Sequence, residues 1–215
     1  LYAILLDKNG NELEVNTQQV GFRTVEIKGA QLLVNGKPIL IKGANRHEMD
    51  PETGYVISRE RMLQDIRIMK ELNINAVRTC HYPDNNYWYY LCDKYGIYVV
   101  AEANVESHGM GYGEKTLAKR TDYALAHLER NQRNILRNRN HPSVIVWSLG
   151  NEAGMGVNFD ACYDWIKKED ISRPVQYEQA RTGKSTDIYC PMYLGYDGCE
   201  KYAKGNPEKP LIQCE

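Results

Sequence analysis

From about residue 22 onward, short apolar segments alternate with segments of helical periodicity, and this alternation constrains the fold more than any other feature of the chain. Several of the apolar segments, such as 98–101 and 143–149, are nearly continuous, which is typical of parallel strands covered on both faces. The predicted strands are 38–42, 75–79, 98–101, 143–149, 175–178, 187–190 and 211–214, and the predicted helices are 58–72, 85–95, 121–139 and 159–168.

Two α/β architectures satisfy this pattern: a doubly wound sheet and a (β/α)8 TIM barrel. No Gly-rich phosphate loop follows the first strand, and polar residues lie just past the carboxyl ends of several different strands. Those ends meet at one mouth in a barrel, which favours the barrel. We therefore predict a TIM barrel over residues 25–215 that is truncated before strand 8, since an eighth strand is expected after Glu215. The polar strand-end residues are Arg46, His47, Glu48, His81, Tyr82, Glu102, Asn151, Glu152, Tyr193 and Glu215.

The first 24 residues follow a different pattern. Residues 1–6 and 12–20 alternate in polarity around Asn9-Gly10, a dipeptide that favours a tight hairpin turn. A lone hairpin is marginal in water, so residues 1–24 are predicted to be the last strands of an immunoglobulin-like β-sandwich domain. Leu1 already resembles the middle of a strand, and the natural N-terminus is expected to lie upstream. The sequence therefore does not decide whether the protein is cytoplasmic or periplasmic.

Charge and cysteine spacing exclude several classes of protein. With 27 Lys and Arg against 28 Asp and Glu, the net charge is −1, and neither nucleic acid nor an anionic membrane is an expected partner. The longest apolar runs fall far short of the roughly 20 residues that span a bilayer. The six cysteines have no CxxC spacing, so buried free thiols are favoured over a structural zinc site or a disulfide framework.

Two glutamates suggest a specific chemistry. Glu152 follows the fourth predicted strand and Glu215 ends the seventh, so the two lie across the barrel mouth from each other. Cleavage of a glycosidic bond needs one carboxylic acid to protonate the leaving oxygen and one carboxylate on the other side of the anomeric carbon. Either glutamate alone would be taken for a solvated loop residue. As a pair they fit these two roles, and the sequence around them favours this interpretation.

The sequence around these glutamates resembles glycoside hydrolase family 2, in its β-galactosidase branch. Residues 148–153 (SLGNEA) resemble the family's acid/base motif, and residues 210–215 (PLIQCE) resemble its nucleophile strand. Further matching segments, in the family's order, are 21–23, 43–48, 75–78, 81–83, 102–109 and 191–193. The resemblance thus covers nearly the whole chain.

The resemblance implies a retaining exo-glycosidase that hydrolyses terminal non-reducing β-D-galactose residues by double displacement. Glu152 would be the acid/base and Glu215 the nucleophile. Arg78 and Tyr193 would orient Glu215. The residues implied to bind substrate are His47, His81, Asn151 and Tyr193.

The same resemblance implies a magnesium site formed by Glu106, His108 and Glu152, and no organic cofactor. A β-galactoside is the implied substrate, and a homo-oligomeric full-length protein is compatible with it. Two alternatives remain open: another family 2 activity, β-glucuronidase or β-mannosidase, and a catalytically silent carbohydrate-binding barrel. Because barrel closure needs its last strand, residues 1–215 tested alone are expected to be inactive.

Overall fold

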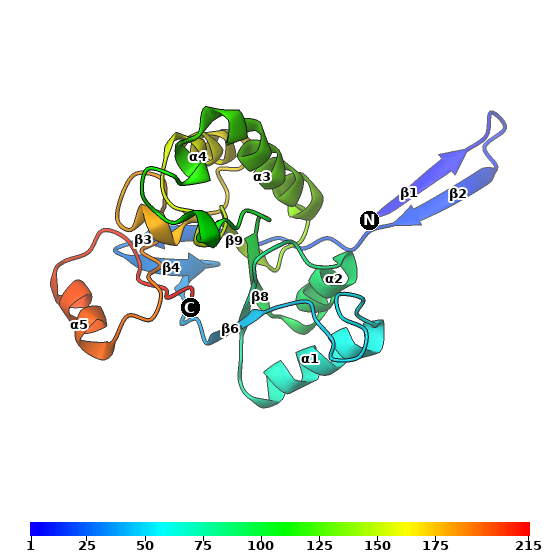
Figure 1. Ribbon diagram of the computed structural model, residues 1–215. Coiled ribbons are helices and arrows are strands. Elements are labelled where there is room, and N and C mark those ends of the chain that lie inside the picture. The colour runs from blue at the N-terminus through cyan, green and yellow to red at the C-terminus, as the bar shows by residue number, and fades with distance from the viewer.

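The computed structural model describes residues 1–215 and contains a five-stranded parallel sheet in the order β10-β9-β8-β7-β6 (Figure 1). Single parallel bridges, Gln176 to Ile188 and Tyr189 to Leu211, continue this order through the last two predicted strands. The predicted barrel is confirmed, although those two strands are reduced to bridges. The strands of the sheet are β6 (Gly43–Arg46), β7 (Ala76–Thr79), β8 (Tyr98–Glu102), β9 (Val144–Ser148) and β10 (Val175–Gln176).

The prediction of the first barrel strand at 38–42 was wrong, because that strand is β6, at Gly43–Arg46. Residues Lys37–Pro38 form β5, the last strand of a three-stranded antiparallel sheet with β3 (Val25–Lys28) and β4 (Gln31–Val34). The apolar residues that suggested a strand, Ile39 and Ile41, instead pack against a buried cluster that includes Leu32, Val100 and Ile145.

The four predicted helices are present, with ends close to those expected. They are α1 (Arg59–Glu71), α2 (Asn86–Tyr95), α3 (Ala124–Asn138), preceded by a 3-10 turn at Thr121–Tyr123, and α4 (Val157–Glu169). The side chain of Ser58 caps α1 by accepting a hydrogen bond from the Arg61 N–H at 3.1 Å. Gly96, with φ of 70°, ends α2 in the left-handed conformation.

The helix α5 (Tyr196–Lys204) was not predicted. It is short, it contains Gly198, which lowers helix propensity, and it buries no residue fully. It lies between the strand positions of Ile188–Tyr189 and Leu211, at the far side of the sheet from α1 and α2 (Figure 1).

The core lies between the sheet and the helices. Trp88 of α2 and Trp147 of β9 are fully buried there, as their positions within predicted elements indicated. All six cysteines are free, five of them buried and Cys199 partly so. The prediction of buried free thiols is therefore confirmed for five of the six.

The sheet curls so that its first strand approaches the last segment of the chain. Asn45 on β6 donates a hydrogen bond from Nδ2 to the carbonyl of Cys214 at 2.8 Å. A cavity of about 570 Å³ remains between these segments, and both Arg78 and Glu215 line it. This is the position that an eighth strand takes in a complete barrel.

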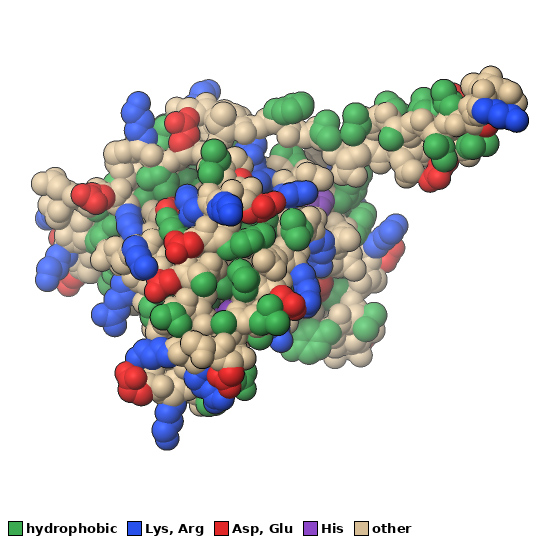
Figure 2. Space-filling model, turned by 90° about the horizontal axis from the view of Figure 1, so that it is seen from above, with side chains coloured by type: hydrophobic (Ala, Val, Ile, Leu, Met, Phe, Trp, Pro, Cys, Tyr) green, Lys and Arg blue, Asp and Glu red, His purple; other side chains and the backbone are tan.

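The N-terminal hairpin of β1 (Tyr2–Leu6) and β2 (Glu12–Thr17) projects away from the barrel (Figure 1). Its apolar side chains, including Leu5 and Leu13, are exposed, and Figure 2 shows them along the projecting arm. Assignment of residues 1–24 to a sandwich domain stays a prediction. None of the helices combines the length and apolar character that crossing a bilayer requires.

Candidate active site

Arg78, the third residue of β7, lies at the centre of the predicted site. Its Nε donates to Glu102 at 2.7 Å, its Nη1 to Glu215 at 2.9 Å, and its Nη2 to Oδ1 of Asn151 at 2.7 Å. Burial alone would lower the pKa of Arg78, but the facing carboxylates of Glu102 and Glu215 raise it above its ordinary value. Arg78 is therefore a permanently charged clamp that joins three strand ends.

Glu215 receives a hydrogen bond on each carboxylate oxygen. Arg78 binds Oε1, and the hydroxyl of Tyr193 donates to Oε2 at 2.6 Å. Burial would raise the pKa of Glu215, but the bonds from Tyr193 and Arg78, with the charge of Arg78, bring it below its ordinary value. Glu215 is thus ionised and fixed in orientation, as a nucleophile must be.

Glu152 lies in a different environment. A sharp turn follows β9, in which Gly150 has φ of 152° and Glu152 itself has φ of 42°. The hydroxyl of Tyr112 donates to Oε1 of Glu152 at 2.7 Å, and Nδ1 of His108 lies 3.1 Å from Oε2. No arginine or lysine pairs with Glu152. One glutamate of the pair is therefore held by an arginine, and the other contacts a phenol and an imidazole.

The two predicted sugar-binding histidines lie beside Glu215, the predicted nucleophile. Nδ1 of His81 is 2.8 Å from Oε1 of Glu102, and Nε2 of His81 is 3.7 Å from Oε1 of Glu215. The rings of His47 and His81 meet edge to face at 5.3 Å. Burial and the neighbouring His81 lower the pKa of His47, which favours its neutral form.

Glu106, His108 and Glu152 form the candidate metal site. One ligand atom from each lies within 4.8 Å of the other two. Two carboxylates and an imidazole are suitable ligands for a hard divalent cation that keeps several waters. Asn151 connects this site to the nucleophile, because its Nδ2 donates to Glu106 at 2.6 Å while its Oδ1 accepts from Arg78. Every predicted site residue thus belongs to one connected region.

Three further residues of the site were not predicted as functional. Glu102 orients both Arg78 and His81, Tyr112 binds Glu152, and Glu178 accepts the backbone N–H of Glu152 at 2.8 Å. Glu102 directly follows the predicted strand 98–101 and was grouped with the polar strand-end residues, although no role was assigned to it. Tyr112 lies in a Gly-rich loop and Glu178 follows a strand of two residues, so neither carries a local signal.

Comparison with known proteins agrees with this geometry. Residues 25–215 match the model of "Glycosyl hydrolases family 2, TIM barrel domain". A protein named beta-galactosidase from Photobacterium profundum is 48% identical over 98% of this chain, and another from Lactococcus lactis is 46% identical over the whole chain. The chain spans about a fifth of their length, 22% and 23% respectively.

The fold also resembles solved structures. A β-glucuronidase from Ruminococcus gnavus in complex with D-glucaro 1,5-lactone superimposes with a TM-score of 0.81 at 25% identity, covering 99% of this chain and 41% of that one. The family match and these relatives place the chain in the glycoside hydrolase class. The chain belongs to glycosyl hydrolase family 2, as a TIM barrel domain of that family.

Proposed function

We propose that the protein is a retaining exo-acting β-galactosidase that releases terminal non-reducing β-D-galactose. The observation that carries the proposal is the contrast between its two glutamates. Glu215 is bound by Arg78 and Tyr193 on both oxygens, whereas Glu152 contacts the hydroxyl of Tyr112 and the imidazole of His108 and has no arginine or lysine partner. The first arrangement suits a nucleophile and the second a proton donor. The 46 to 48% identity to proteins named beta-galactosidase supports the choice of sugar.

In the proposed reaction, Glu152 gives its proton to the glycosidic oxygen while a carboxylate oxygen of Glu215 attacks the anomeric carbon. The bond to the leaving group breaks and a covalent glycosyl-enzyme forms. Glu152, now ionised, removes a proton from water, which attacks the same carbon and frees Glu215. Two inversions give net retention, and the two carboxyl groups should then lie about 5 to 5.5 Å apart.

The sugar contacts are assigned to Asn151, His47, His81 and Tyr193. Both amide atoms of Asn151 already have a protein partner, but each retains one further site, a lone pair on Oδ1 and a hydrogen on Nδ2. A sugar 2-hydroxyl would form a hydrogen bond at one of these two remaining sites. His47 is exposed and His81 partly so, which leaves both rings accessible to a ligand.

Glu106, His108 and Glu152 would hold a magnesium ion in this proposal. The fit rests on the convergence of their ligand atoms and on a donor set that includes two carboxylates. When bound, the cation would supply positive charge that favours the ionised form of Glu152. The amide of Asn151 holds Glu106 in place by its 2.6 Å bond.

A glucuronidase is less well supported, although solved glucuronidases share the fold. Recognition of a uronic acid requires a cation that is free to bind its carboxylate. Arg78 is paired with Glu102 and Glu215, and Arg46 is paired with Asp65 and Asp84. Both arginines of this region are thus committed to protein carboxylates.

The test compares Glu152→Gln with Glu215→Gln in the protein at its full natural length, with the exposed Glu114→Gln as control. Glu215→Gln should abolish turnover of p-nitrophenyl β-galactoside. Glu152→Gln should still form the intermediate from substrates with good leaving groups, and azide should intercept it to give β-galactosyl azide. Rescue of the Glu215 variant to the β product would reverse the roles. A faster rate on a β-glucuronide or a β-mannoside than on the β-galactoside would show that the assigned sugar is wrong.

A further inference from the structure

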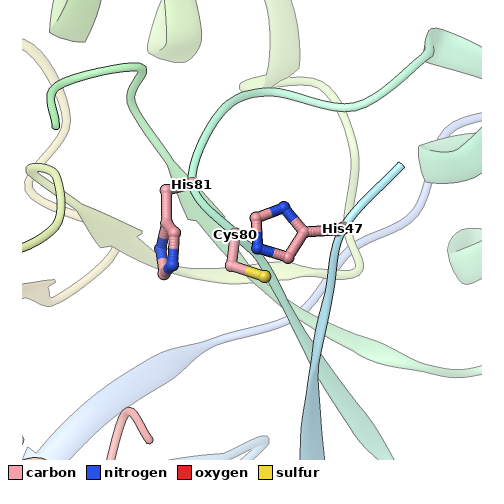
Figure 3. Close-up of side chains that lie close together, drawn as sticks. All are labelled: His47, Cys80 and His81. Carbon is pink, nitrogen blue, oxygen red and sulfur yellow. The ribbon is translucent and has the colours of Figure 1, made fainter. Parts of the chain in front are cut away.

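Cys80 lies between the two sugar-site histidines. It follows β7 directly, and its side chain is buried, with an exposed fraction of 2%. One ligand atom from each of His47, Cys80 and His81 lies within 4.8 Å of the other two, and Figure 3 shows the thiol between the two rings. None of the hydrogen bonds of the active site uses this thiol. The cluster therefore has a chemistry that the proposed hydrolysis does not require.

The two imidazoles are arranged as metal ligands are. Nδ1 of His81 faces the buried carboxylate of Glu102 at 2.8 Å, which leaves Nε2 to bind. Nδ1 of His47 lies 3.3 Å from the hydroxyl of Tyr82, which also leaves Nε2. A histidine whose second nitrogen is held by a carboxylate or similar partner is the usual arrangement in metal sites.

Two imidazole nitrogens and a thiolate suit zinc and similar thiophilic cations, and are poor ligands for magnesium. Bond lengths of about 2.0 to 2.3 Å place the ligand atoms of tetrahedral zinc roughly 3.3 to 3.8 Å apart. Since the ligand atoms lie within 4.8 Å of one another, binding would bring them closer by at most about 1 to 1.5 Å. The thiol would release its proton to solvent on binding.

We propose that His47, Cys80 and His81 form an inhibitory site for Zn²⁺ and other thiophilic divalent cations. The inhibitory part rests on the proposed function. Oε1 of Glu215 lies 3.7 Å from Nε2 of His81, so a cation bound to that nitrogen attracts the nucleophile as a fourth, oxygen ligand. It also occupies space between the sugar-binding rings. Both effects make the cation compete with substrate.

This site differs from a structural zinc site, which the cysteine spacing disfavours. His47 is 33 residues before Cys80 in the chain, and the two meet only because β6 and β7 are neighbours in the sheet. The thiol comes from the strand end itself and no second cysteine takes part. His47, Cys80 and His81 supply three ligands, and the fourth position is left to an oxygen of Glu215, unlike in the closed all-Cys/His structural sites.

The first measurement detects the site without using activity. Cadmium is added to the full-length protein in saturating Mg²⁺, which occupies Glu106, His108 and Glu152 where that site binds, and the ultraviolet band of a cadmium–thiolate bond is recorded. One equivalent should give the band in the unaltered protein and in Cys199→Ser, which removes the thiol of α5. The band should be absent in Cys80→Ser. A band that persists in a folded Cys80→Ser overturns the proposal.

The second measurement is inhibition by Zn²⁺. It should be competitive with substrate, reversed by chelator, and weakened about tenfold or more in Cys80→Ser and Cys80→Ala. Circular dichroism establishes that each variant is folded. Inhibition that is unchanged in both variants but lost in His108→Ala would assign the effect to the other site and overturn the proposal. A Cys80-dependent cadmium band in a protein without galactosidase activity would support the metal site and reject the proposed function.

Discussion

The backbone N–H of Glu152 donates a 2.8 Å hydrogen bond to Oε1 of Glu178, a carboxyl group that is almost fully buried. Burial raises the pKa of Glu178 to about 7, although the bond from Glu152 opposes the rise. Glu178, whose pKa lies near neutral, thus holds the backbone of Glu152, the predicted acid/base residue. Its charge state affects both stability and the position of Glu152.

The first prediction concerns stability. The folded-state pKa of Glu178 lies above the ordinary 4.5, so the folded state binds this proton more tightly than the unfolded state. The resulting stability is present below about pH 4.5 and is lost as pH rises toward about 7. Glu178→Gln cannot ionise, so it does not lose this stability as pH rises. The free energy of unfolding of the variant, relative to that of the unaltered protein, should therefore increase by up to about 1.4 kcal/mol per pH unit in this window. Denaturant unfolding at pH 5, 6, 7 and 8 measures the difference.

A matched control for that series is Glu12→Gln, at an exposed position in the hairpin. It should run parallel to the unaltered protein across the same pH values. If Glu178→Gln also runs parallel, Glu178 is ionised throughout and the argument from burial is wrong.

The second prediction concerns Tyr193, whose phenol stabilises the ionised form of Glu215 by a 2.6 Å bond. Tyr193→Phe should raise the pKa of Glu215, so that activity is lost at a higher pH when the solution is acidified. Because Tyr193 is 80% exposed, water screens this bond, and kcat/KM should decrease by about fivefold or less. The pH profile of kcat/KM measures both effects. An acid limb that does not move would show that Tyr193 does not act on Glu215.

The third prediction concerns the metal. Removal of divalent cations with EDTA should reduce activity, and Mg²⁺ should restore it. His108→Ala removes a ligand, so half-maximal restoration should require about 10- to 100-fold more Mg²⁺. Activity that is the same with and without chelator, and in both proteins, would exclude a role for the site.

The fourth prediction tests the turn that presents Glu152. A Cβ atom on Gly150 would lie 2.5 Å from the carbonyl oxygen of Val105, and the residue has φ of 152°. Gly150→Ala should therefore destabilise the protein by at least about 2 kcal/mol and displace Glu152. Gly113→Ala is the control, because a Cβ atom there meets nothing within 4 Å. Thermal unfolding compares the two, and equal melting temperatures would contradict the steric argument.

The order of the barrel strands after the first could be predicted because several of them carry their own signal, an apolar run with a polar residue at its carboxyl end. Val144–Ser148 is the clearest example. The first strand was misplaced because Ile39 and Ile41 are as apolar as a strand requires, yet cover an apolar cluster instead. Local composition does not distinguish an apolar barrel strand from an apolar segment that covers a buried cluster.

The predicted site residues were found through their motifs, and the missing ones depend on contacts between distant segments. Tyr112 meets Glu152 across 40 residues, from a loop whose path no local pattern specifies. Glu178 meets the same residue across 26 residues, after a strand of only two residues. Such pairings arise from the curvature of the sheet, which the sequence does not display.

The clamp formed by Arg78 makes hydrolysis a sensor of folding. Its guanidinium joins Asn45, Glu102, Asn151 and Glu215, and the last of these is 137 residues away along the chain. Under the proposed function, a partly assembled molecule could not align Glu215, so catalysis would begin only when the entire mouth has come together. The release of a coloured product during refolding would then time the arrival of the final segment, without a fluorescent label or a bound reporter.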